Sequence, residues 1–213
     1  MDWRTDQLSE RDIYKLLVNT VLPRPIALVT TCDAKGRFNA APFSFFNVMG
    51  SEPPIVAIGI EANQNNLDGL KDTARNIAQS GEFVVNLVDE ALVNAINVCA
   101  VDFSSDIDEI SVAGLTMADS KQVRVPRIAE SPVQLECRQH TTLLIGPNRH
   151  LVIGEVVHIH IRDDIVDERF YVDPDRLGLV GRLHGNGWYS RITDRFQAPR
   201  PNLENWLQTT TEK

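Results

Sequence analysis

The chain has 213 residues, 43% of them hydrophobic, and a formal net charge of −8 at pH 7. This is enough material for one domain with a substantial core, and the acidic balance argues against nucleic acid as a partner, because phosphates need a basic face. No apolar run approaches the roughly 20 residues of a membrane helix, the N-terminus lacks the features of a signal peptide, and three scattered cysteines make neither a disulfide framework nor a zinc motif, so we expect a cytoplasmic protein without a membrane partner.

The N-terminal part of the chain predicts a helix followed by a β-hairpin. Apolar residues recur at helical spacing through residues 6–19. Two apolar runs follow, at 26–32 and 38–46, and the turn between them contains Gly36, which can adopt the positive φ that closes a hairpin. These runs therefore predict two antiparallel strands.

The second strand of this hairpin contains Pro42, which cannot donate a hydrogen bond to a neighbouring strand. The strand should therefore lie at a sheet edge or at an irregularity. Strict alternation along it would place Phe43 and Phe45 on one face and Ser44 and Phe46 on the other. Its other residues near the proline are small or polar: Asn39, Ala40, Ala41 and Asn47. Such a composition leaves backbone free to contact a flat ligand.

The rest of the chain predicts more strands than helices. The expected elements are a strand at 55–60, a helix at 66–80 stopped by Gly81, a strand at 83–88, a helix capped by Asp89, a short helix near 106–110, strands at 133–144 and 150–162 around a turn at 146–148, and an extended tail from 198. Because the strands arrive mainly as hairpins, we expect a mainly β, α+β fold, an antiparallel barrel with a few packed helices. No glycine-rich nucleotide motif follows a strand, which argues against a doubly wound sheet.

The start of the helix near residue 72 is the best anion site visible in the sequence. A helical turn beginning at Thr73 would direct free N–H groups and the helix dipole at a negative ligand. Lys71 and Arg75 add positive charge, although Arg75 can pair with a carboxylate instead. Alternatively, Asp72 is a good N-cap for an ordinary amphipathic helix. The residues by themselves leave both interpretations open.

The histidines give weaker indications. His158 and His160 share one face of a strand, a spacing that can bring two metal ligands together. No third ligand is evident, so we expect no metal site. His140 and His150 flank a hairpin turn, and no set of Ser, His and Asp or of Cys and His indicates nucleophilic catalysis.

Six short motifs occur in an order and spacing that are specific when taken together. They are Arg24-Pro25-Ile26-Ala27, Asn39-Ala40-Ala41-Pro42-Phe43-Ser44, Pro53-Pro54, Lys71-Asp72-Thr73 with Asn76-Ile77, Glu82-Phe83-Val84-Val85-Asn86 and Gly154-Glu155-Val156-Val157. This set resembles the flavin reductase-like family, the FMN-binding split barrels, over residues 21–189. The resemblance implies a split-barrel domain at 21–192, between an N-terminal lead-in at 1–20 and a C-terminal arm at 193–213.

The resemblance also implies where non-covalent FMN would bind. Its phosphate would lie at the helix start, and its ring system would lie along the second strand of the hairpin. The residues expected at the phosphate are Lys71, Asp72, Thr73 and Asn76. The residues expected at the ring are Asn39, Ala41, Pro42, Phe43, Ser44, Phe45 and Asn47.

A few residues outside these two groups are also candidates for ligand contact. Thr30 and Thr31 would contact ribityl or phosphate oxygens, unless β-propensity alone explains them. Arg24 would reach the phosphate or stack on a ring, unless it is an ordinary surface arginine. The segment 182–189 resembles a late motif of the family, and His184 in it is a candidate substrate contact. The resemblance brings the region of His140 and His150 towards the cofactor without choosing between them.

By resemblance, the expected function is an FMN-dependent oxidoreductase. Electrons would pass from NADH or NADPH through FMN to free flavin, to an acceptor protein or to another acceptor, because the cofactor carries the chemistry and the protein supplies orientation. Two alternatives are a non-enzymatic FMN electron carrier and a binding or sensor module without flavin. The family covers its flavin site with a second subunit, so we expect a homodimer, with Trp206 and Leu207 in the arm that reaches across.

Overall fold

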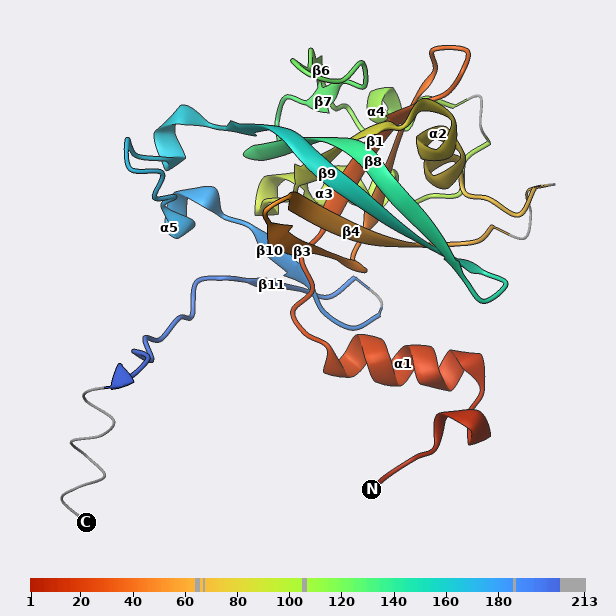
Figure 1. The fold of residues 1–213 in the computed structure, drawn as a ribbon, viewed down its shortest axis with the longest axis horizontal. Coiled ribbons are helices and arrows are strands. Elements are labelled where there is room, and N and C mark those ends of the chain that lie inside the picture. The colour runs from red at the N-terminus through yellow and green to blue at the C-terminus, as the bar shows by residue number, and fades with distance from the viewer. Residues whose placement is uncertain (64–65, 67, 105–106, 186, 204–213) are drawn as a thin grey trace.

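The computed structural model describes residues 1–63, 66, 68–104, 107–185 and 187–203. Its body is a seven-stranded antiparallel sheet in the order β2-β1-β5-β8-β9-β4-β3 (Figure 1). The strands are β1 (Ala27–Cys32), β2 (Phe38–Phe43), β3 (Phe46–Ser51), β4 (Pro54–Glu61), β5 (Glu82–Leu87), β8 (Val133–Ile145) and β9 (Arg149–Ile161). Two small two-stranded sheets accompany it: β6 (Met117–Ala118) with β7 (Arg127–Ile128), and β10 (Val180–Arg182) with β11 (Tyr189–Arg191). The predicted mainly β, antiparallel fold is confirmed.

Helical elements are short and lie around this sheet (Figure 1). The α-helices are α1 (Glu10–Thr20), α2 (Asp72–Ser80), α3 (Val93–Val98), α4 (Glu109–Val112) and α5 (Pro174–Leu177). Single turns of 3-10 helix occur at η1 (Thr5–Gln7), η2 (Glu90–Leu92) and η3 (Asp163–Ile165). None of the helices in the described part of the chain is long and apolar enough to cross a membrane.

The predicted hairpin is present as β1 and β2, and Gly36 in its turn has a φ of +80°. Pro42 lies in β2, which is an edge strand, as its missing N–H requires. The continuous strand over 38–46 was a wrong prediction, because the chain leaves β2 after Phe43 and enters β3 at Phe46. These two strands lie at opposite ends of the sheet order.

The corner between β2 and β3 explains why the alternation predicted for this segment is also wrong. The Phe45 carbonyl accepts a hydrogen bond from Gly59 N of β4 at 2.7 Å, so the corner crosses from one sheet edge to the other. Phe43 and Phe46, which alternation placed on different faces, both belong to the same buried cluster. The bend, rather than the pleat, decides their directions.

Three buried clusters pack against the sheet, the smallest of them made by Val84, Val123 and Val125. The largest fills the inside of the barrel and the underside of α2, and contains Val29, Ile58, Phe83 and Val85. The second joins β1 to the helices and turns that follow β5, and contains Leu28, Val88, Leu92, Ile96, Ile110 and Ile128. Neighbouring residues of β1 therefore serve different clusters, as the two-residue period of a strand requires.

Several predicted boundaries of helices are confirmed and one is wrong. Gly81 ends α2 in a left-handed conformation, and the Asp89 side chain accepts from Leu92 N at the start of η2. The helix predicted over 66–80 begins only at Asp72, because the preceding residues form a turn in which Gly69 has a φ of +71°. Leu67 and residue 106 of the other predicted short helix lie outside the described residues, and that helix is observed as α4.

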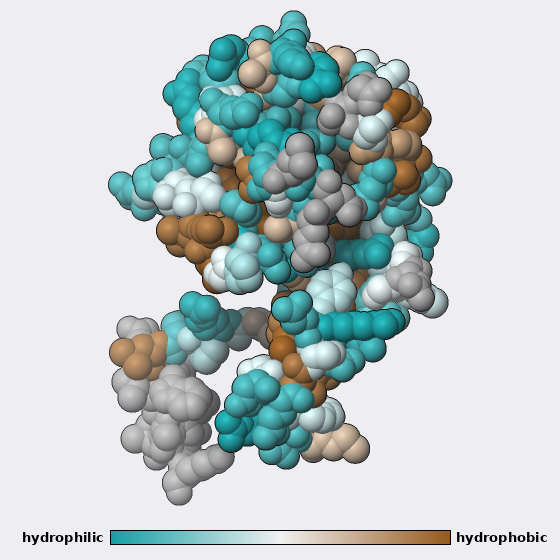
Figure 2. Space-filling view, turned by 90° about the vertical axis from the view of Figure 1, so that its right-hand side faces the viewer, coloured by the Kyte–Doolittle hydropathy of each residue, from teal (hydrophilic) through white to brown (hydrophobic). Residues whose placement is uncertain are grey.

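The two terminal segments stand away from the barrel. Val18 is the only buried residue of α1, and the described tail to residue 203 is extended and exposed (Figures 1 and 2). Trp206 and Leu207 of the predicted arm lie outside the described residues. The division at 20/21 and 192/193 stays a prediction.

Candidate functional site

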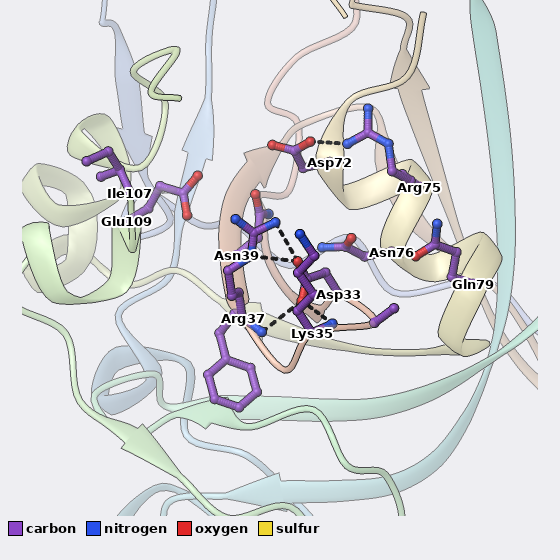
Figure 3. Close-up of a pocket in the computed structure, with 12 residues that line it drawn as sticks. Asp33, Lys35, Arg37, Asn39, Asp72, Arg75, Asn76, Gln79, Ile107 and Glu109 are labelled. Carbon is purple, nitrogen blue, oxygen red and sulfur yellow. Dashed lines mark hydrogen bonds and ion pairs between the residues drawn. The ribbon is translucent and has the colours of Figure 1, made fainter. Parts of the chain in front are cut away.

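A cleft of two adjoining lobes lies along β2 and the start of α2. The first lobe has a volume of about 160 Å³ and the second of about 240 Å³ (Figure 3). Asn39, Asp72 and Glu109 border both lobes. The first lobe is otherwise lined by Ala41, Pro42, Phe43, Asn63, Lys71, Thr73, Cys99, Ala100, Val101, Asp102 and Phe103. The structure thus brings the two predicted ligand segments, the edge strand and the helix start, to one place.

The N-terminus of α2 opens into the first lobe. Its N-cap residue, Lys71, makes no side-chain capping hydrogen bond, so the first N–H groups of this helix keep their donors for a ligand. The Thr73 side chain is buried beside them, with 1% of the residue exposed. Lys71 is the only cation among the described residues that line the first lobe. This arrangement suits an anion that arrives from the strand side.

Arg75 is held by carboxylates and does not face the first lobe. Its guanidinium donates to Asp68 at 2.7 Å and pairs with Asp72 (Figure 3). Hydrogen bonding from Arg75 lowers the pKa of Asp68 well below its usual range. The alternative interpretation of Asp72 as an N-cap is wrong, because Asp72 is the first residue of α2 and its carboxylate pairs with Arg75. The pairing neutralises Asp72 as a neighbour of the anion site.

Glu109, the first residue of α4, is a member of the site that the sequence did not reveal. Figure 3 shows it on one side of the second lobe, with Asp72, Arg75 and Asn76 of α2 on the other. Its Oε2 atom is buried and has no hydrogen-bond partner among the described residues. Burial raises the pKa of this carboxyl, and the charge of Asp72 adds to the effect. A neighbouring N-cap, Asp108, is the only local pattern that could have drawn attention to the position.

The Asn39 amide connects the two sides of the cleft. With the amide turned so that both of its ends are satisfied, its NH2 group donates to Glu109 Oε1 at 3.3 Å. Its oxygen then accepts from the Thr73 hydroxyl at 3.2 Å. Asn39 therefore orients the Thr73 hydroxyl and links it, through its own amide, to the Glu109 carboxyl.

The two predicted threonine contacts separate onto different faces of β1. Thr30 is fully buried, and its hydroxyl donates to the Pro126 carbonyl at 2.7 Å, on the side away from α2. Its hydroxyl is thus bonded within the chain, and its contact with a cofactor stays a prediction that this geometry does not favour. Thr31 faces α2, where it accepts from the Asn76 amide at 3.0 Å and so ties the helix to the sheet. Asn76 also lines the second lobe.

Arg24 is neither a surface residue nor free to bind a phosphate. Only 7% of it is exposed. Its guanidinium donates to the carbonyls of Val18, Val21 and Leu183 at 2.8–3.0 Å, and its Nε to Ser44 Oγ at 3.3 Å. Burial lowers its pKa. The interpretation as a surface arginine is wrong, because Arg24 fastens the end of α1 and the segment after β10 to the barrel. Its contact with a cofactor stays a prediction that these bonds do not favour.

The β2–β3 corner carries its side chains away from the two lobes. Phe45 lies under the Arg149 guanidinium, 5.4 Å from its ring centre, beside a groove formed with α1. Asn47 is exposed, and its side-chain oxygen accepts from Val48 N at 2.8 Å. Ser44, Phe45 and Asn47 therefore do not line the cleft, whereas Asn39, Ala41, Pro42 and Phe43 do.

The candidate histidines also lie outside the cleft within one chain. No described residue of the segment 183–189 lines either lobe. The His184 ring lies 6.0 Å from that of Trp188, and the Tyr189 hydroxyl donates to Asn97 at 2.8 Å. His140 is exposed and His150 is half-buried, and neither borders a lobe.

Comparison with known proteins bears on this geometry. The uncharacterized protein YwrF of Bacillus subtilis is 40% identical over 206 residues, which cover 94% of this chain and 98% of that protein. Among solved structures, nitrilotriacetate monooxygenase component B from Bacillus cereus has a TM-score of 0.88 at 31% identity, and covers 93% of this chain and 98% of its own. The 2-nitrobenzoate 2-nitroreductase NbaA of Pseudomonas fluorescens has a TM-score of 0.86 at 34% identity, and covers 95% and 98%.

The family match covers most of the barrel. Residues 19–178 match the family described as "Flavin reductase like domain". That span includes β1 to β9, α2 and the whole cleft. A putative flavin reductase with split barrel domain from Shewanella frigidimarina NCIMB 400 has a TM-score of 0.80 at 20% identity, and covers 94% of this chain and 100% of its own, which establishes the fold as a split barrel. The chain belongs to the flavin reductase-like family.

Proposed function

We propose that this protein is an FMN-binding oxidoreductase, which passes electrons from NADH or NADPH through bound FMN to free flavin, to an acceptor protein or to another acceptor. The family and its solved members support flavin-related oxidoreductase activity. FMN and the nicotinamide are the finer part of the proposal.

A single observation carries the choice of FMN. The uncapped start of α2, with Lys71 and the buried Thr73, lies in the same lobe as the Ala41–Phe43 segment of the edge strand β2. An uncapped helix start suits a phosphate, and an edge strand has backbone groups without a strand partner, which suit the polar edge of a flavin ring. One phosphate site and one site for a flat ring in the same lobe correspond to the phosphate and the ring system of a flavin mononucleotide.

The residues of the cleft divide the tasks of binding. Lys71, the Thr73 hydroxyl and the first N–H groups of α2 would hold the phosphate, with Asn39 orienting Thr73. Bound FMN supplies two-electron chemistry that no side chain of the site provides. Phe43 and Pro42 would exclude water on the strand side, where Glu109, whose pKa is raised by burial, also borders the lobe.

The size of the first lobe, which holds both the helix start and the Ala41–Phe43 segment, favours a homodimer as the binding unit. Its volume of about 160 Å³ is smaller than the roughly 300 Å³ of the smaller ligand pockets. One chain would therefore leave a flavin ring open to water on one side. The other edge strand, β3, exposes Val48 and Met49 by about 60% of their surface, and a second subunit placed over such an edge would complete the site.

Flavin titration of the purified chain tests the proposal. FMN fluorescence should be quenched with one FMN per chain, and light scattering should give the mass of a dimer. Addition of NADH or NADPH without oxygen should then bleach the flavin absorbance.

The possible results separate the functions. Tight FMN binding without bleaching by either nicotinamide would favour an electron carrier that a partner protein reduces. Failure to bind FMN at micromolar concentration would overturn the proposal in favour of a module without flavin. A monomer that still binds FMN tightly would contradict the shared site.

A further inference from the structure

Glu136, His158 and His160 form a cluster at the centre of the sheet, outside the cleft. Glu136 lies in β8 directly opposite His158 of β9. One ligand atom from each of the three side chains lies within 4.8 Å of the other two. The sequence shows the two histidines on one strand face, but the third ligand comes from a neighbouring strand, 22 residues earlier in the chain, and only the fold brings it there.

The Glu136 carboxylate is held rigidly. It is completely buried, and it accepts hydrogen bonds from the backbone N–H groups of Lys121, Gln122 and Val123 at 2.7, 2.6 and 3.1 Å. Its Oε1 atom lies 2.5 Å from His160 Nε2. Burial alone would raise its pKa, but the hydrogen bonds from His160 and the backbone outweigh burial and lower it. The group is thus an ionised carboxylate in a fixed orientation, with no lysine or arginine paired to it among the described residues.

The two histidines leave an opening for a ligand. His158 makes no hydrogen bond or ion pair with any described residue. Its ring packs against the ring of His160, with 4.6 Å between the ring centres. Both imidazoles are partly exposed, while Glu136 beneath them is not. The half-buried His158 imidazole, which lies beside the buried Glu136 carboxylate and has no hydrogen bond to a described residue, is thus available to bind a ligand.

We propose that this cluster binds a divalent transition-metal ion of the zinc class. His158, Nε2 of His160 and Oε1 of Glu136 would be its protein ligands, and water would complete a tetrahedral set. Two histidines and one carboxylate are a ligand combination that Zn²⁺ uses, at about 2.0–2.2 Å from each atom. Small rotations of the two imidazoles close the observed spacing, and the proton between His160 and Glu136 leaves when the metal enters.

The backbone N–H groups on Glu136 are the feature that makes this set suitable for a metal. Ligating carboxylates are usually oriented by hydrogen bonds of their own, and such outer contacts raise affinity. Here the turn at 121–123 provides them before any metal arrives. A bound ion would therefore clasp β9 to β8 and, through Glu136, to the 121–123 turn.

This site is separate from the proposed flavin cleft. Glu136 pairs with Val84, which pairs with Thr30, and Thr30 bonds to Pro126 on the face that the 121–128 segment covers. The neighbouring Thr31 points to α2, on the other face. Metal binding can therefore be tested whether or not the protein holds flavin.

Metal titration of the full chain after EDTA treatment tests the proposal. Calorimetry with Zn²⁺ should give one ion per chain, and Co²⁺ should give the intense visible bands of a tetrahedral complex. His158→Ala and His160→Ala should each weaken Zn²⁺ binding by at least about tenfold, the scale seen when the surroundings of a metal site are disturbed. His140→Ala, which removes an exposed histidine from the same hairpin, is the matched control and should bind as the wild type does.

Three outcomes would overturn the proposal. They are the absence of stoichiometric uptake, uptake that survives both His158→Ala and His160→Ala, and uptake that His140→Ala weakens to the same degree. The first would leave His160 as a simple cover for the buried carboxylate. Thermal melting of each variant without metal checks that a loss of binding is not a loss of fold.

Discussion

Glu136 is completely buried and Glu109 is half-buried, and the two differ in what surrounds their carboxylates. Glu136, in the central strand β8, receives three backbone N–H groups and His160, and its pKa is lowered. Glu109, beside the edge strand β2, has a buried oxygen without a partner among the described residues, and its pKa is raised.

The difference between these two regions distinguishes structure from binding. On the covered face, buried polar groups are satisfied within the chain: Thr30 by Pro126, Asn86 by Leu28 and Ile128, and Glu136 by the 121–123 turn. At the cleft, an uncapped helix and an orphaned carboxylate oxygen persist. Buried polar groups in native proteins are normally bonded, so the uncapped helix and the free oxygen at the cleft support the proposed ligand site there; Ser190 Oγ in β11 is also buried without a partner among the described residues.

Glu136→Ala should have the largest effect on stability. It removes the acceptor of three backbone N–H groups in the 121–123 turn, of which the one from Val123 is buried and the other two are partly buried. An unsatisfied buried group costs about 1–3 kcal/mol, so we expect a loss of at least about 2 kcal/mol in the free energy of unfolding, measured by urea denaturation in EDTA. Glu109→Ala, measured in the same way, should lose far less. Equal losses for the two variants would remove the distinction between the regions, and Glu136→Gln, which keeps one acceptor, should fall between them.

Thr73→Ala should have the largest effect on ligand binding. The variant removes a hydroxyl at the start of α2, and a hydrogen bond to a charged group contributes about 1–2 kcal/mol. FMN affinity, followed by fluorescence, should fall by that amount while riboflavin affinity, which involves no phosphate, stays unchanged. Thr30→Ala is the matched control, because Thr30 faces the covered side and should leave FMN affinity unaltered. An equal loss for riboflavin would contradict the phosphate role of Thr73.

Local signals in the sequence predicted much of the fold. Gly36, Pro42 and Gly81 each act through their own backbone, so the hairpin, the edge strand and the end of α2 could be read directly. The anion site at Lys71 and Thr73 stays a prediction, although the uncapped helix start on which it depends is observed. The sequence did not predict that the chain turns after Phe43 and crosses to the opposite edge of the sheet, because two-residue alternation assumes that a strand continues.

The errors at the site follow from contacts between distant segments. Arg24 looked like a free cation because its acceptors, among them Leu183, are carbonyls that no residue pattern marks. Glu109 and Glu136 looked like ordinary acids because the burial that raises the pKa of Glu109 and the hydrogen bonds that lower the pKa of Glu136 both depend on segments elsewhere in the chain. Thr30 and Thr31 differ only in the face on which they fall, and a single sequence does not tell which face holds the ligand.

His184→Ala should have a smaller effect, on kinetics alone. Its loop does not border the cleft within one chain, so a contact with substrate requires the loop of a second subunit. In that case the KM for the nicotinamide or the acceptor should rise a few-fold with little change in kcat, the sign of lost uniform binding. His140→Ala should change neither constant. Wild-type kinetics for His184→Ala would confine the site to the residues of the cleft.

Glu109→Gln should have the smallest effect, and its dependence on pH should identify the cause. Burial and Asp72 raise the folded-state pKa of Glu109, so the ionised carboxylate is less favourable in the folded chain than in the unfolded one. The wild type therefore loses stability as the pH rises through that folded pKa, whereas below the unfolded value of about 4.3 the group is protonated in both states and costs nothing. Glutamine removes the cost.

At neutral pH the Glu109→Gln variant should gain less than about 1 kcal/mol in unfolding free energy, since the group is only half-buried and solvent screens it. The gain should vanish in acid. The same variant should bind FMN somewhat more tightly at neutral pH, because it removes a negative charge near the phosphate. Glu168→Gln, at an exposed position, is the control. A gain that is the same at every pH would show that packing, and not the ionisation of Glu109, separates the two carboxylates.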